Sequence, residues 1–185
     1  MVQMDMTNNL FLGPDAQARF LMQSLMAHDG KGEITRTETH VIDGVHLSND
    51  PEAEITGTYE SRPGELLRLK SVPRGDARPR WQALHVAMGP ADLSEAGVLG
   101  VVIRSRAPAS ITTRVCLRSG RDGAFVDNFF AKSMISFAQE STHLDVIDLA
   151  RTPDLPRSAQ WRDLVLFFRA GEVELELLDL RLFIV

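Results

Sequence analysis

The chain has 185 residues, of which 44% are hydrophobic and 24% are charged. These proportions are those of a globular protein, and they exclude a wholly disordered or collagen-like chain. The chain has 20 Lys and Arg residues against 25 Asp and Glu residues, which gives a net charge of −5 at pH 7. Nucleic-acid binding is not expected, because phosphate contacts need clustered positive charge.

The first residues, MVQMDMTNNLFLG, lack the basic start and the long apolar run of an export signal. No apolar stretch reaches the length of a membrane span. The single cysteine, Cys116, excludes an intramolecular disulfide. We therefore expect a cytoplasmic protein without membrane contact.

Residues 14–28 predict a helix, because Pro14 suits a first helical turn and apolar residues recur at helical spacing after it. These apolar residues form a methionine-rich stripe on one face of the helix, and two interpretations of it are open: it packs on the main domain, or it binds another subunit. The apolar positions of the stripe are Ala18, Leu21, Met22, Leu25 and Met26.

A β-hairpin follows the helix. Asp43 and Gly44 lie between two alternating segments, where a two-residue turn favours positive φ. The run Ser-Asn-Asp-Pro at residues 48–51 then interrupts the pattern. We divide the chain into an N-terminal arm, residues 1–53, and a principal domain, residues 54–185.

The principal domain reads as a succession of short strands separated by turn residues, without a long amphipathic helix between them. This pattern is typical of a two-layer antiparallel β-sandwich and excludes a parallel βαβ fold. The expected strands are residues 65–72, 81–88, 98–106, 111–118, 124–131, 133–137, 142–149, 161–169 and 172–185, after a first strand beginning near residue 55.

Two strands have informative patterns. Residues 161–169 are apolar on both faces, which predicts a central strand. In residues 172–185 the apolar positions change parity at Leu177 and Leu178, so a β-bulge is expected there. The chain ends on an apolar run, which predicts a final strand that is paired within a sheet.

The common catalytic signatures are absent: there is no nucleophile elbow, phosphate loop, His-Glu-x-x-His or Cys-x-x-Cys. Cys116 has no histidine near it in sequence and is expected to be a structural thiol. The hairpin is expected to bring His40 and His46 side by side. No His-x-His pair exists, so no metal site is assigned.

Charged residues form two periodic sets. Glu172, Glu174 and Glu176 share one face of the last strand. Arg104, Arg106, Arg114 and Arg118 share parity on two consecutive strands, and they would form one basic surface if those strands pair. Such a surface would receive the carboxylates of an acidic glycan or, as the favoured alternative, those of the glutamate ladder.

Residues 147–185 resemble the last strands of galactose-binding-like jelly rolls, the fold of many carbohydrate-binding modules. In those domains a Trp-x-x-Leu strand leads through a hairpin to a final strand that closes the sandwich. Trp161, Leu164 and residues 173–182 occupy these places, with Trp161 interpreted as a core residue. The resemblance covers residues 55–185 and implies a mainly β fold: an antiparallel jelly-roll β-sandwich, here with an N-terminal helix and hairpin extension.

The resemblance also implies a glycan as partner and a non-catalytic role, such as assisting polysaccharide metabolism. Sugar sites of that fold combine exposed aromatic rings with polar side chains that bond the hydroxyl groups. We therefore select Trp81, His85, Arg104 and Arg114 as candidate ligand-binding residues. No catalytic residue, metal ligand or cofactor is assigned.

Two other functions remain open. The first is a structural module without a small ligand, which forms a homo-oligomer through residues 1–53. The second is a cupin-like metal-dependent enzyme that uses His40, His46, His85 and His143.

Overall fold

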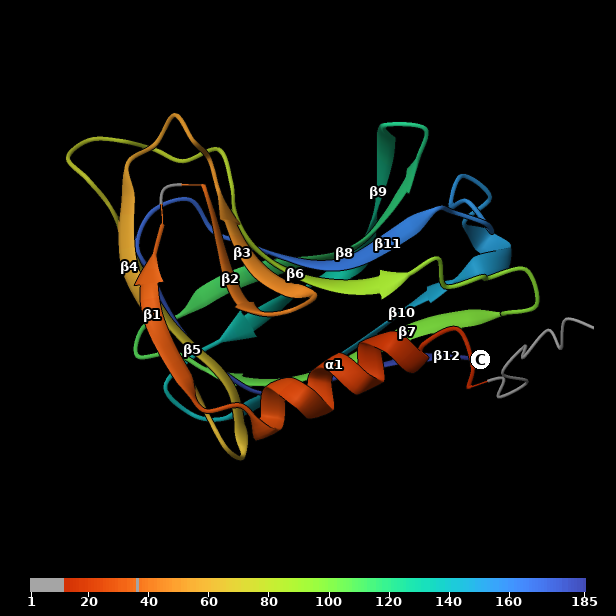
Figure 1. Ribbon diagram of the computed structural model, residues 1–185, viewed down its shortest axis with the longest axis horizontal. Helices are drawn as coiled ribbons and strands as arrows, with labels where there is room; N and C mark the ends of the chain where they lie inside the picture. Colours follow the sequence, from red (N-terminus) through yellow and green to blue (C-terminus); the bar gives the residue numbers. More distant parts are fainter. Residues whose placement is uncertain (1–11, 36) are drawn as a thin grey trace, which may run out of the picture.

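The computed structural model describes residues 12–35 and 37–185. Its strands form two six-stranded antiparallel sheets packed face to face (Figure 1). Sheet A contains, in spatial order, β1 (Gly30–Ile34), β4 (Ile55–Arg62), β5 (Glu65–Pro73), β12 (Val173–Ile184), β7 (Val98–Arg106) and β10 (Ser141–Asp148). Sheet B contains β2 (Glu38–Ile42), β3 (Val45–Asn49), β6 (Gln82–Gly89), β11 (Trp161–Phe168), β8 (Ile111–Arg121) and β9 (Ala124–Ser136). The predicted antiparallel β-sandwich is confirmed.

Helix α1 (Ala16–Ala27) precedes the strands, and a short 3-10 helix, η1 (Leu149–Arg151), follows β10. No helix among the described residues is long and apolar enough to cross a membrane.

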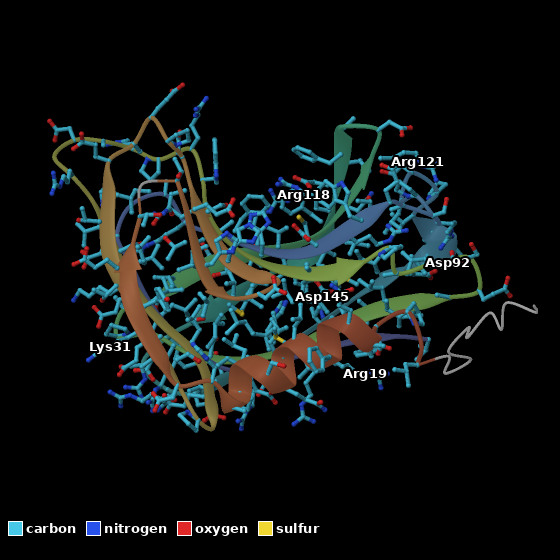
Figure 2. All side chains as sticks on the ribbon, viewed as in Figure 1. Arg19, Lys31, Asp92, Arg118, Arg121 and Asp145 are labelled. Atoms are coloured by element: carbon cyan, nitrogen blue, oxygen red, sulfur yellow. The ribbon has the colours of Figure 1, made fainter. Side chains whose placement is uncertain are left out.

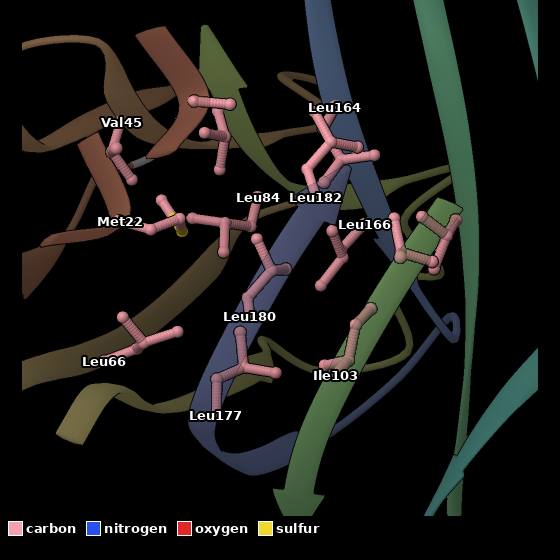
Figure 3. Close-up of a cluster of buried hydrophobic side chains, with 14 of the residues drawn as sticks. Met22, Val45, Leu66, Leu84, Ile103, Leu164, Leu166, Leu177, Leu180 and Leu182 are labelled. Atoms are coloured by element: carbon pink, nitrogen blue, oxygen red, sulfur yellow. The ribbon is translucent and has the colours of Figure 1, made fainter. Parts of the chain in front are cut away.

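The core lies between the two sheets, because alternate side chains of every strand point inward. In β6, for example, Leu84, Val86 and Met88 are buried in the common core cluster. Figure 3 shows leucines of both sheets meeting Met22 of α1 in this layer. Burial of each such side chain contributes about 1.5–3 kcal/mol to stability.

Residues 1–53 supply parts of both sheets and of the core wherever they are described. Helix α1 buries Ala18, Leu21, Met22 and Leu25 in the core cluster. Strand β1 pairs with β4 in sheet A, while β3 pairs with β6 in sheet B. The apolar stripe of the helix therefore packs on the protein's own core, as the first of its two interpretations proposed.

The hairpin turn between β2 and β3 is confirmed at Asp43 and Gly44. Gly44 has φ +78°, a conformation that favours glycine. A Cβ atom on Gly44 would also lie 2.8 Å from Cδ1 of Leu21. The glycine therefore permits both the turn and the close packing of α1 against it.

Strand β12 is shared between two neighbours. Residues 173–177 pair with β5, and the strand pairs with β7 from Glu176 as far as Ile184. The register with β7 shifts between Leu177 and Asp179, which confirms the predicted bulge. The inward side chains on both sides of the bulge thereby stay in the core, and the expected pairing of the C-terminal strand is confirmed.

Strand β9 is a single strand where the sequence pattern predicted two. It runs without a break from Ala124 to Ser136, and its register with β8 shifts between Arg114 and Cys116. Lys132, at which the prediction separated the two strands, lies within this irregularity instead. By contrast, β11 is central as predicted, since it pairs with β6 on one side and with β8 on the other.

Candidate functional site

Two of the four candidate residues, His85 on β6 and Arg114 on β8, lie on the face of sheet B that points away from sheet A. We call this the outer face of sheet B. Trp81, half-buried, immediately precedes β6, and the guanidinium carbon of Arg80 lies 5.2 Å from its ring centroid. Arg104 lies on β7 in sheet A, so the structure does not bring all four residues together.

The four arginines of the predicted basic surface are separated because β7 and β8 belong to different sheets. Arg104 forms an ion pair with Glu140 at 3.0 Å, and Arg106 binds Glu176 at 2.5 Å. Lys70 pairs with Glu174 at 3.0 Å. Two glutamates of the ladder therefore pair with basic residues of sheet A, but Arg106 is the one member of the predicted arginine set whose ion pair with the ladder is seen among the described residues.

One end of the outer face of sheet B carries exposed aromatic rings. Trp161 and Phe125 flank Gly120 in register, with exposed fractions of 38% and 57%. A Cβ atom on Gly120 would lie 1.9 Å from the Trp161 ring, so the ring lies directly on the glycine. The prediction that Trp161 is a core residue was wrong, because the inward position is occupied by its neighbour Arg162.

The next row of this face is charged. Asp163, Arg118 and Asp127 are in register on β11, β8 and β9. Arg118 donates two hydrogen bonds to the Asp127 carboxylate, each 2.7 Å long, which raises the pKa of the arginine. Its guanidinium also lies 4.0 Å from the Phe125 ring centroid. Figure 2 shows Arg118 above the strands of sheet B.

A third row buries the cysteine. Cys116 lies in register between Val165 and Phe129 and is fully buried. Burial raises the pKa of the Cys116 thiol to about 12, so the thiol stays protonated, as the structural interpretation requires. Phe129 is 37% exposed, and the guanidinium of Arg114 stacks on its ring at 3.9 Å. Arg114 makes no ion pair with any residue in the described part of the chain.

The row of Cys116 and Val165 continues across the sheet with three histidines in register. His40, His46 and His85 come from β2, β3 and β6. The rings of His46 and His85 stack with centroids 4.5 Å apart, and those of His40 and His46 lie 5.7 Å apart. The expectation that the hairpin brings His40 and His46 side by side is confirmed. Burial and the adjacent His85 lower the pKa of His46.

The four histidines of the metalloenzyme alternative do not assemble, because His143 lies on β10 in sheet A. Within residues 12–35 and 37–185, no group of three or more His, Cys, Asp or Glu side chains has a geometry that would hold a metal ion.

His85 connects two residues that sequence reasoning missed. Its Nε2 lies 2.9 Å from Oγ of Ser48 on β3, and its Nδ1 lies 3.3 Å from Oδ2 of Asp163 on β11. Both ring nitrogens are therefore engaged within the protein. No sequence signal links these three residues, which are adjacent only through the pairing of β3, β6 and β11.

The exposed rings of β9 were also missed, although the sequence holds a signal for them. Phe125, Asp127 and Phe129 alternate, and Phe129 is followed directly by Phe130. Because consecutive strand residues point to opposite faces, one ring of that pair must point outward. The structure buries Phe130 and leaves Phe129 on the outer face.

Comparisons with known proteins identify the fold. No protein-family profile and no curated protein sequence matches the chain. Among solved structures, a CBM4 module aligns with a TM-score of 0.55 and 11% identity over 83% of this chain and 95% of the module. Fold likeness at this level defines the chain as a carbohydrate-binding-module-like jelly roll.

Other structures on the same fold align less closely. The xylan-binding domain CBM22-1 of Xyn10C from Paenibacillus barcinonensis gives a TM-score of 0.48 and 9% identity over 85% of this chain and 96% of the domain. The family 11 carbohydrate-binding module of the cellulosomal cellulase Lic26A-Cel5E from Clostridium thermocellum gives 0.48 and 10% over 85% and 96%.

Proposed function

We propose that the protein binds a carbohydrate chain on the outer face of sheet B. The observation that carries this proposal is the arrangement of exposed rings on both sides of a charged row. Trp161 and Phe125 lie on one side of Asp163, Arg118 and Asp127, and Phe129 lies on the other. The fold supports the proposal, since the CBM4 module shares it.

This arrangement suits a sugar chain because each pyranose has an apolar face and a rim of hydroxyl groups. The rings offer flat apolar surface, while the carboxylates and the guanidinium accept and donate hydrogen bonds beside them. The first and third rows are marked on β11 by Trp161 and Val165, which are four residues apart, or about 13 Å along the strand. The face is therefore suited to a short oligosaccharide rather than to a single sugar.

Arg114 gives the face a preference for acidic chains. Its guanidinium is exposed and held on the Phe129 ring, and no carboxylate in the described chain neutralises it. A planar guanidinium fixed in this way is suited to a uronate carboxylate. The positive charge of Arg118, by contrast, is already paired with Asp127.

The test is a screen of neutral and uronate-containing oligosaccharides on an array, followed by calorimetric titration of those that bind. Phe125→Ala and Trp161→Ala should each weaken binding about fivefold, since a stacked ring contributes on the order of 1 kcal/mol. Phe20→Ala is the matched control, because Phe20 is a ring 66% exposed on α1, away from this face. Arg114→Gln should weaken only the uronate chains.

Absence of binding to every oligosaccharide would refute the function itself. Binding that survives Phe125→Ala and Trp161→Ala unchanged would instead place the sugar elsewhere on the molecule.

A further inference from the structure

Ser48, His85 and Asp163 form a continuous hydrogen-bonded chain on the outer face of sheet B. They come from β3, β6 and β11, which are adjacent in the sheet. Ser48 Oγ lies 2.9 Å from His85 Nε2, and His85 Nδ1 lies 3.3 Å from Asp163 Oδ2. These are the connections of a nucleophile, a general base and a carboxylate that orients the base.

The proton positions in this hydrogen-bonded series follow from the chemistry of the Asp163 carboxylate and the Ser48 hydroxyl. The ionised Asp163 carboxylate can only accept, so Nδ1 of a neutral His85 carries the proton that it donates to Asp163. Nε2 is then an acceptor, and the hydroxyl of Ser48 donates to it. This tautomer is the one in which an imidazole can remove the proton of a serine.

The surroundings hold His85 in place. Its side chain is 8% exposed, and that of Asp163 is 19% exposed. The ring of His46 stacks on that of His85 with an interplanar angle of 8°. Ser48 is only half-buried, so its hydroxyl lies at the surface end of the chain. A fixed base beside a more accessible hydroxyl is the arrangement that nucleophilic catalysis requires.

We propose that Ser48 is a nucleophile that hydrolyses carboxylic esters, with His85 as general base and Asp163 as its positioning residue. Ser48 Oγ attacks the ester carbonyl carbon while its proton passes to His85 Nε2. The tetrahedral adduct expels the alcohol, which takes that proton, and leaves an acyl-Ser48 ester. Water then attacks the acyl group and gives its proton to His85, which returns it to Ser48 as the carboxylic acid leaves.

The site predicts slow turnover. Ser48 lies in a strand paired on both sides, so its own N–H belongs to the sheet and is not free for an oxyanion. The residue opposite Ser48 on β2 is the acidic Glu38, and Arg80 is bound to Asp50 through its backbone N–H, Nε and Nη2 at 2.8, 2.9 and 3.0 Å, so neither residue supplies a free positive charge to an oxyanion. Loss of one oxyanion donor typically costs about 10²–10³ in rate. Covalent reaction with Ser48 is therefore a better readout than turnover.

The substrate class is a small carboxylic ester, such as an acyl group on a hydroxyl of the ligand. This inference goes beyond the proposed carbohydrate binding and does not depend on it. If both hold, the substrate is an O-acylated glycan lying across the same face.

The decisive experiment treats the full chain with a fluorophosphonate probe and locates the phosphonyl group by peptide mass spectrometry. We expect the probe on Ser48 of the wild type and no labelling of Ser48→Ala. Ser133→Ala is the matched control, because Ser133 is an exposed serine on β9 of the same sheet, opposite Arg114. Its labelling should equal that of the wild type.

Asp163→Asn tests the positioning role, because it keeps the shape of the side chain but reverses the favoured tautomer of His85. The labelling rate should fall about 100-fold or more, with the melting temperature unchanged. p-Nitrophenyl acetate hydrolysis should show the same loss in kcat with little change in KM.

Wild-type protein without a label on Ser48, or equal labelling rates in wild type and Asp163→Asn, would overturn the proposal. Oligosaccharide binding is measured in parallel on Ser48→Ala, which retains every ring of the face. Failure of the ester chemistry is thereby distinguished from failure of carbohydrate binding.

Discussion

Arg162 places a guanidinium group in the interior of the sandwich, at a position of β11 whose neighbours on the same side are Leu164 and Leu166. It is fully buried, and burial lowers its pKa to about 10. The group donates five hydrogen bonds, which satisfy most of its capacity. The acceptors are the carbonyl oxygens of Pro90, Ala91, Pro156 and Arg157 and the hydroxyl of Ser119. Arg162 thereby ties two loops to the sheet.

Replacement of Arg162 by Met should destabilise the fold by about 3 kcal/mol or more, because several buried acceptors lose their donor at once. Chemical denaturation followed by circular dichroism measures this loss. Arg181→Met is the control, since the Arg181 side chain is 76% exposed and, among the described residues, forms an ion pair with Asp179 alone. It should change the stability by less than about 1 kcal/mol. A similar effect of both substitutions would show that the buried network contributes little.

The pair Trp161 and Arg162 also shows where residue-level prediction failed. Hydrophobicity assigns the tryptophan to the core and the arginine to solvent, and the structure reverses both. The reversal depends on carbonyl groups of Pro156 and Arg157, six and five residues earlier, and on those of Pro90 and Ala91, about 70 residues earlier, whose approach no local pattern reveals. Ser48 and Asp163 were missed for a related reason, because their meeting at His85 is a product of strand pairing.

At the scale of elements, the sequence predicted most of the strands, since period-two alternation and turn residues mark them directly. Even the bulge of β12 was predictable, because a change of parity leaves a visible trace in the positions of the leucines. The prediction divided β9 at Lys132, which lies within the irregularity of its pairing with β8. A register shift inside a strand and a turn between strands have similar composition, so the sequence alone does not separate them.

The final strand carries a prediction of its own. Deletion of residues 182–185 removes Leu182 and Ile184, which are 4% and 9% exposed, and each contributes about 1.5–3 kcal/mol through burial. It also removes the hydrogen bond that Val185 N donates to Val98 O, and the pairing of β12 with the start of β7. Against a typical total of about 5–15 kcal/mol, the truncated chain should be largely unfolded.

Thermal melting of the truncated and full chains provides the measurement. Val185→Ser is the control, because the Val185 residue is 71% exposed and the substitution keeps the backbone contacts. It should melt within a few degrees of the parent. A truncated protein that melts equally well would show that the end of β12 is dispensable.

At the scale of the whole molecule, the sequence did not predict which strands become neighbours. Residues 98–106 and 111–121 follow one another in the chain, yet they form β7 and β8 in different sheets. Arg104 and Arg114 therefore lie on opposite sides of the sandwich. Their shared parity would have placed them on one surface only if the two strands had paired. His85 and Arg114 share a face because β6 and β8 both pair with β11, whose place at the centre was the part that the sequence did indicate.

The same topology bears on the division between residues 1–53 and 54–185. A fragment of residues 54–185 would lack α1, β1, β2 and β3. It would expose the edges of β4 and β6, together with the core surface that α1 covers. We expect this fragment to aggregate or to melt without a cooperative transition.

Differential scanning calorimetry and proton NMR test this expectation. The full chain is the control and should melt in one cooperative transition. A cooperative melt and a dispersed spectrum from residues 54–185 would establish instead that these residues are an independent domain.

The buried thiol at the centre of the outer face of sheet B has a practical consequence. Cys116 packs with Ala83 and Val165, and Phe167 lies against this cluster. Since the Cys116 sulfur points to the outer face and is covered there by side chains, a thiol reagent reaches it only when covering side chains such as Phe167 move aside. The modification rate of the one cysteine in the chain thus reports the free energy of this opening. A ligand bound across β9 and β11 would hold these side chains in place, so its occupancy could be read as protection of a single sulfur atom.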